Sequence, residues 1–272
     1  MDSPRRTGED REGTDGGAKG DAETACDPRT TGEYVRRVSY FSEGATGSLT
    51  LVGVVHDHPA SVYRVRKTVE EVDPDVLALE LPPTAVPLFE QYAETERSPP
   101  VFGGEMSAAV QTARTEETVG IDGPTRRYLT RLAGCLLRER PSTDTTRKVL
   151  SSTFSATRHA IVCRLAASIS AVTDLRLEVD SPVPHDIGAD ETAETQAEDE
   201  HRQVRRARAF MDAFRTASRS RATRLVDTVR EEHMADRLSE LDGVDAEKDV
   251  VAVVGIDHLD AVAELLDSNK EE

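Results

Sequence analysis

Apolar positions along this chain follow two spacings, one typical of strands and one typical of helices. Apolar and polar residues alternate over 34–40, a loop with two glycines follows, and an apolar run then ends at Val55. Together these features predict a β-hairpin. From Pro59 valines recur at helical spacing, and a second buried run follows at 76–79. Strand, helix and strand within 35 residues predict parallel strands joined by a right-handed crossover. We also expect helices at about 86–94 and 103–113, strands at 118–121 and 249–254, and a closing helix at 260–266.

The middle of the chain, residues 125–240, has long helical patterns and no convincing buried strand. Residues 181–200 contain prolines, a glycine and many acids, so we expect a solvated loop there. Residues 1–32 are nearly devoid of apolar groups and are expected to be a disordered acidic tail. The predicted architecture is α/β: a mostly parallel sheet within residues 33–272, interrupted by a large helical insertion. The expected helices of this insertion cover about 127–140, 145–172, 202–217 and 219–241.

Composition narrows the classes of function. The net charge of −17 argues against nucleic-acid binding, because phosphate binding requires a basic surface. Acids are abundant and lysines scarce, a balance typical of adaptation to high salt. Three cysteines form neither a disulfide framework nor a CxxC metal motif. There is no secretion signal and no apolar stretch long enough to span a bilayer, so a soluble, cytoplasmic protein is expected.

Polar side chains follow four of the predicted parallel strands at the point where each strand ends. Because ligand-binding groups collect at the carboxyl edge of open α/β sheets, we expect these side chains to share one crevice. Imidazoles and carboxylates are a ligand set for Mn, Co, Fe or Zn, and such a metal would acidify its bound water. Gly53 and Gly255, each three residues before a histidine, would allow close approach by a backbone or a substrate. The four side chains are His56, Glu80, Asp122 and His258.

Other readings of the histidines have less support. His56-Asp57-His58 after a strand also resembles the start of barrel metallohydrolases, but those need further ligands on later strands, which this chain lacks. His233 lies outside any HExxH motif, so a helix-borne zinc protease site is not predicted. No GxSxG motif, phosphate-binding loop or dinucleotide fingerprint occurs.

An ordered set of sequence blocks resembles the TraB/PrgY/GumN family, which is related to the TIKI proteases and to the erythromycin-esterase/ChaN-like group. The resemblance covers about residues 48–268. It implies an α/β fold of two related halves and, as in the TIKI branch, metal-dependent proteolysis with His56, Glu80 and His258 in the site. The blocks are Val52-Gly53-Val54-Val55-His56, the segment 74–81, Gly104-Glu105-Met106-Ser107-Ala108-Ala109, Ile121-Asp122, the segment 230–235, and Val251 to Leu259 with its Gly255-Ile256-Asp257-His258.

The chain departs from the family pattern at several positions. Pro82-Pro83-Thr84 stands where an Arg usually follows the Glu, and Gly123-Pro124 follows Asp122. Arg230-Glu231 replaces the usual Arg-Asp, and Asp257 replaces a small residue. Many members also carry a membrane-spanning carboxyl-terminal part, whereas this chain stops 14 residues after His258, so we expect a soluble, divergent member.

The leading functional hypothesis is a divalent-metal-dependent hydrolase acting on peptides, with Mn, Co or Zn as cofactor. His56 and His258 would bind the metal, Glu80 would be a ligand or general base, and Arg230 would contact an oxyanion or carboxylate. The alternative is a protein that binds a peptide or small molecule in the same crevice without turnover. A third hypothesis is an interaction protein that the long helices assemble into an oligomer. Supporting roles are expected for Gly53, Gly255, Asp122, Glu105, Glu231 and Asp257.

Overall fold

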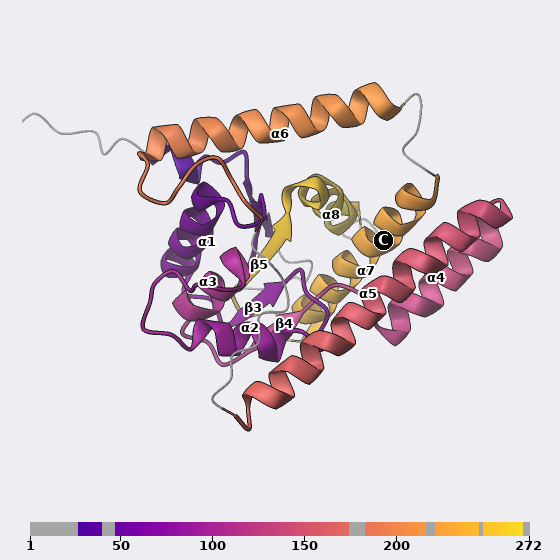
Figure 1. The fold of residues 1–272 in the computed structure, drawn as a ribbon, viewed down its shortest axis with the longest axis horizontal. Coiled ribbons are helices and arrows are strands. Elements are labelled where there is room, and N and C mark those ends of the chain that lie inside the picture. The colour runs from indigo at the N-terminus through magenta and orange to yellow at the C-terminus, as the bar shows by residue number, and fades with distance from the viewer. Residues whose placement is uncertain (1–26, 40–46, 174–182, 216–220, 245–246, 269–272) are drawn as a thin grey trace, which may run out of the picture.

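The computed structural model describes residues 27–39, 47–173, 183–215, 221–244 and 247–268. Five strands form one sheet in the order β1-β2-β5-β3-β4 (Figure 1). β1 (Val35–Ser39) pairs antiparallel with β2 (Ser48–Val54), and the other pairings are parallel. The predicted hairpin and the mostly parallel α/β sheet are therefore confirmed. The other strands are β3 (Val76–Leu79), β4 (Thr118–Gly120) and β5 (Val250–Gly255).

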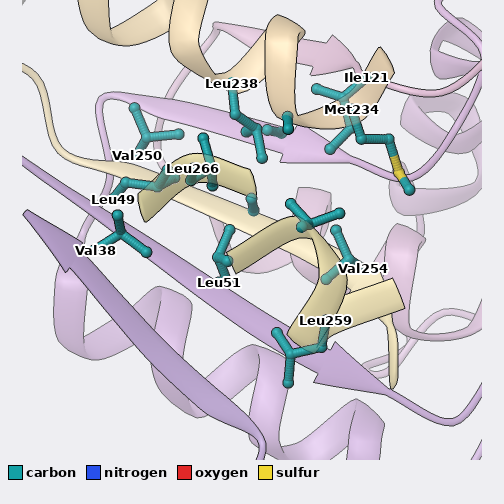
Figure 2. Packing of buried hydrophobic residues seen from close by; sticks show 14 of the residues in the cluster. Val38, Leu49, Leu51, Ile121, Met234, Leu238, Val250, Val254, Leu259 and Leu266 are labelled. Atoms are coloured by element: carbon teal, nitrogen blue, oxygen red, sulfur yellow. The ribbon is translucent and has the colours of Figure 1, made fainter. Parts of the chain in front are cut away.

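Alternate residues of the strands supply two apolar cores, one on each face of the sheet. On one face, Val52, Leu77 and Val251 pack with α1 (Pro59–Val72) and α3 (Gly104–Thr112). On the other face, Leu51, Ala78 and Ala252 pack with α7 (Arg221–Val244) and α8 (Ile256–Ser268), as Figure 2 shows for this cluster. Because helices cover both faces, the central strands are apolar on both sides, and this explains their unbroken apolar runs.

The predicted helical insertion lies between β4 and β5. α4 (Arg126–Glu139) and α5 (Thr143–Ser170) pack on α7 through a separate cluster that contains Tyr128, Val149 and Val229. α2 (Val86–Ala93) contacts the other end of α5. α6 (Ala193–Arg215) crosses the molecule next to α1 and away from α4 (Figure 1). No helix of the described part is long and apolar enough to cross a membrane.

Two predictions about the ends of elements need correction. Residues 193–200, expected in a solvated loop, form the first two turns of α6, where Gln196 and Glu200 are buried. Residues 27–32, expected in the tail, include a 3₁₀ turn (Pro28–Thr30), and the Arg29 guanidinium lies 3.4 Å from the centre of the Tyr63 ring. Polar side chains hold both segments in place, which an apolar pattern does not reveal. Residues 1–26 and 174–182 lie outside the described residues, so the rest of the tail and the start of the expected loop stay predictions.

Candidate functional site

Side chains from the ends of three adjacent parallel strands meet in one crevice. His56 lies two residues beyond β2, Glu80 directly follows β3, and His258 is the third residue of α8, which directly follows β5. All three line a cavity of about 320 Å³, together with Arg230 from α7. The convergence predicted from the strand ends is therefore present, and it involves segments separated by up to about 200 residues of chain.

Glu80 is held in place by main-chain and side-chain donors. Its Oε2 accepts a short hydrogen bond from the Gly255 amide, and its Oε1 accepts one from Arg230 Nη2 at 2.7 Å. The side chain is only 4% exposed, so it needs these partners. The absence of a side chain at Gly255 leaves room for this arrangement, since a Cβ there would lie 3.2 Å from Glu80 Oε2, a tight contact, and 3.6 Å from His56 Nε2.

Arg230 bridges three side chains that the sequence places in the site. Its Nη2 donates to Asp122 Oδ2 at 2.6 Å, and its Nη1 donates to His258 Nε2 at 3.1 Å. Burial would lower the pKa of Arg230, but the charges of Asp122 and Glu80 outweigh it and raise that pKa. The guanidinium is therefore a permanent cation between two carboxylates.

His56 is paired with a buried carboxylate. Its Nδ1 donates to Glu105 Oε1 at 2.7 Å, while Glu105 Oε2 accepts the Asp57 amide at 2.8 Å. The hydrogen bond to Glu105 is the main cause that raises the pKa of His56 to about 9. His56 is consequently protonated at neutral pH, and its Nε2 is close to Gly255 at the crevice.

His258 is paired with a carboxylate in the same way as His56. Its Nδ1 donates to Glu231 Oε1 at 2.9 Å. Burial lowers the pKa of His258, but Glu231 and the nearby charge of Glu80 raise it further than burial lowers it. Glu105 and Glu231, expected as supporting residues, thus each orient one imidazole.

The remaining two supporting residues have different positions. Gly53 lies away from the crevice: a Cβ there would lie 2.7 Å from Leu259 Cδ2, so this glycine allows α8 to pack against β2. Asp257 is exposed and lies on the rim of the cavity. Gly255 is thus the glycine that serves the site directly, whereas Gly53 serves the packing behind it.

The expected metal ligands do not fit a metal ion in this arrangement. Two of the three, Glu80 and His258, bind the Arg230 guanidinium with the atoms that a metal would need. Within the described ranges, no group of three or more His, Cys, Asp or Glu side chains is placed to hold a metal. A divalent cation would have to displace Arg230, so metal binding stays a prediction.

Residues of the 183–207 region also build the site, and the sequence did not indicate them. His185 Nε2 donates to the His56 carbonyl at 2.8 Å, and Gln203, Val204 and Ala207 of α6 line the crevice. The buried positions 196, 200 and 204 of α6 have helical spacing, but two of these three residues are polar, so an apolar pattern does not reveal them. His58, considered as a second ligand beside His56, is instead the fully buried N-cap of α1 and faces Asp199.

A second cavity of about 450 Å³ adjoins the crevice and shares Arg230 with it. It lies between α4, α5 and α7, and its lining includes Asp122 and Pro124, which follow β4, and Tyr128 of α4. Both cavities lie within the size range of small-molecule sites. The helical insertion therefore adds a compartment next to the strand-end residues.

These features define the class of protein: a mostly parallel α/β protein with a charged crevice at the carboxyl edge of its sheet. No protein-family model, no curated protein and no solved structure matches the chain.

Proposed function

We propose that this protein is a hydrolase that cleaves peptide or related acyl bonds in the crevice between β2, β3, β5 and α7. One observation carries the proposal: His56, Glu80, Arg230 and His258 come from separate elements and line one cavity, with each imidazole oriented by its own carboxylate. Such groups, with opposed charges and fixed orientation, are typical of sites that move protons and stabilise developing charge.

Each group has a chemical role in this proposal. Glu80, anionic between Arg230 and the Gly255 amide, accepts a proton from the attacking water. Arg230 stabilises the negative charge that develops on the carbonyl oxygen. His56 is protonated below about pH 9 and donates a proton to the leaving group. The adjoining cavity beside α4 and α5 would hold the substrate's side chain.

We further propose that the chain is a divergent member of the TraB/PrgY/GumN family. The convergence of His56, Glu80 and His258 supports this, because the resemblance assigns these residues to one site. The two GxxH motifs also begin on neighbouring parallel strands, where Gly53 pairs with Val254 and Val54 with Gly255. This near-register placement is what two related halves would produce.

The test is a hydrolysis screen with a fluorogenic peptide library and p-nitrophenyl acetate, without metal and with Mn²⁺, Co²⁺ or Zn²⁺. We expect turnover by the wild type that falls at least 100-fold in His56→Ala and in Glu80→Gln. His201→Ala is the matched control, because His201 is partly exposed and pairs with Tyr34 outside the crevice. Saturable peptide binding without turnover would instead support a binding protein, and equal activity in His56→Ala would refute the proposed roles.

A further inference from the structure

The helix α5 has an uncovered apolar side. Its inner side is buried against α7 and α2 through Val149, Thr153, Ala160, Cys163 and Ala167. On the other side, large apolar side chains recur at spacings of 4, 7, 4, 4 and 3 residues, which keeps them on one side of a helix. They are Leu150, Phe154, Ile161, Leu165, Ile169 and, just past the helix, Val172, between 43% and 82% exposed.

We call these six side chains the α5 stripe. They are the majority of the large apolar side chains that are exposed in the described residues. Isolated exposed apolar residues are ordinary, but five on one side of a helix and a sixth just past its end indicate a surface that is covered in use.

Positive charge accompanies the α5 stripe. Arg147 and Arg158 lie on the same side of α5 as the stripe. Arg147 is three residues before Leu150, and Arg158 lies between Phe154 and Ile161 in the sequence. Arg158 and Arg164 are exposed and form no ion pair with any other described residue. α5 itself, residues 143–170, contains four Arg and Lys against one acid, a net charge of +3. The whole chain carries −17, so the remaining residues carry −20.

We propose that α5 binds the surface of an anionic lipid bilayer, with the α5 stripe entering the interface and the arginines contacting lipid phosphates. An amphipathic surface of apolar side chains and arginines is the combination that such a bilayer attracts. A second copy of the chain would set Arg147, Arg158 and Arg164 against the same arginines, and nucleic acid would leave the apolar side chains uncovered. Charge therefore favours an anionic partner, and the stripe favours one with an apolar interior.

The acidic remainder of the molecule is compatible with this binding. α5 has 28 residues and is about 42 Å long, so the stripe can lie along a membrane over several turns. Figure 1 shows α5 at the side of the molecule opposite α1 and α6, so those two helices would lie away from the lipid. Charges more than about 10 Å from the surface are largely screened at 0.1 M salt.

The experiment is vesicle flotation of the full chain with phosphatidylglycerol vesicles and with phosphatidylcholine vesicles. We expect flotation with the anionic vesicles only, and at least tenfold weaker partitioning at 1 M KCl than at 0.1 M. Phe154→Ser with Leu165→Ser should abolish flotation, and Arg147→Gln with Arg158→Gln should weaken it at least tenfold. All four side chains are exposed, so circular dichroism should show an unchanged fold.

Matched controls replace exposed residues elsewhere. Val101→Ser, at a side chain 51% exposed, and Arg114→Gln, 85% exposed, should leave flotation unchanged. Equal flotation with both lipids, or none with either, would overturn the proposal. So would a dimer in sedimentation velocity that Phe154→Ser dissociates in the absence of lipid, because a second copy would then cover the stripe. None of these outcomes depends on hydrolysis.

Discussion

Arg230 determines the electrostatics of the crevice, and the sequence indicated only part of its role. The chain has 29 arginines, and nothing in the spacing around Arg230 shows that its guanidinium contacts two acids from distant strand ends. Strand ends and glycines could be predicted because they follow local rules of chain geometry. The counter-ion of Glu80 could not, since it comes from a helix 150 residues further along the chain.

Replacing Arg230 tests whether it takes the place of a metal cation. Arg230→Met should lower the free energy of unfolding by about 3 kcal/mol, because Glu80 and Asp122 lose their shared cation. Mn²⁺ should then raise the melting temperature of the variant more than that of the wild type. Thermal unfolding with 0–5 equivalents of MnCl₂ measures this, and Arg202→Met, at an arginine of α6 whose side chain is 48% exposed, is the control. Equal Mn²⁺ effects in wild type and variant would contradict this role.

The pairing of His56 with Glu105 leads to a second prediction for single residues, which concerns the pKa of His56. Glu105→Gln removes the main cause of the raised pKa of His56, which should fall from about 9 toward its ordinary value of 6.5. Because the folded-state pKa lies above the unfolded one, the pair stabilises the fold fully below pH 6.5 and loses this effect as pH rises through about 9. NMR titration of the imidazole and urea unfolding between pH 6 and 10 measure both. A His56 pKa that is unchanged in the variant would show that another group raises it.

At the scale of elements, α6 shows where apolar patterns stop being informative. The helix is fixed by a buried ion pair, in which Arg64 of α1 and Glu200 of α6 are 0% and 1% exposed. Arg64 also donates to the Gly53 carbonyl at 2.8 Å, so the network reaches the strand that carries His56. A stretch of acids was predicted to be solvated, but one of those acids is the partner of a buried arginine. The apolar strands and the helices α1, α4 and α5, by contrast, follow their predicted positions closely.

Breaking that ion pair should loosen α6 from the molecule. Glu200→Gln leaves the Arg64 guanidinium buried without a counter-charge, so the free energy of unfolding should fall by about 3–5 kcal/mol. Urea unfolding followed by circular dichroism measures the change. Glu198→Gln, at an exposed acid two residues earlier on the same helix, should change it by less than about 0.5 kcal/mol. Similar losses in both variants would mean that the ion pair does not anchor α6.

At the scale of the whole molecule, the order of the strands is what joins the two ends of the chain into one site. β5 lies between β2 and β3, so the last strand of the sequence brings Gly255 and His258 into the same crevice as His56 and Glu80. The sequence predicts parallel strands and a helical insertion before the last strand. Nothing in it specifies that this last strand, β5, pairs between β2 and β3 in the sheet. Strand order depends on which apolar faces fit together in space, and this is not a local property.

The net charge of the chain predicts how its melting temperature depends on salt. At −17 the folded chain repels itself, and this repulsion weakens as the screening length falls from about 10 Å at 0.1 M salt to about 3 Å at 1 M. Salt also weakens exposed pairs such as Lys67–Glu71, but each contributes less than about 1 kcal/mol. The repulsion should therefore dominate, and the melting temperature should rise with KCl over this range.

Calorimetry at several KCl concentrations measures that rise, which we expect to be several degrees. A variant with Gln at the exposed acids Glu70, Glu96 and Glu116 should melt higher at 0.1 M and gain less from added salt, because part of the repulsion has been removed. A melting temperature that falls with KCl in both proteins would show that attractive pairs outweigh the excess of negative charge. The acidic composition would then have to be explained by solubility at high salt concentration and not by the stability of the fold.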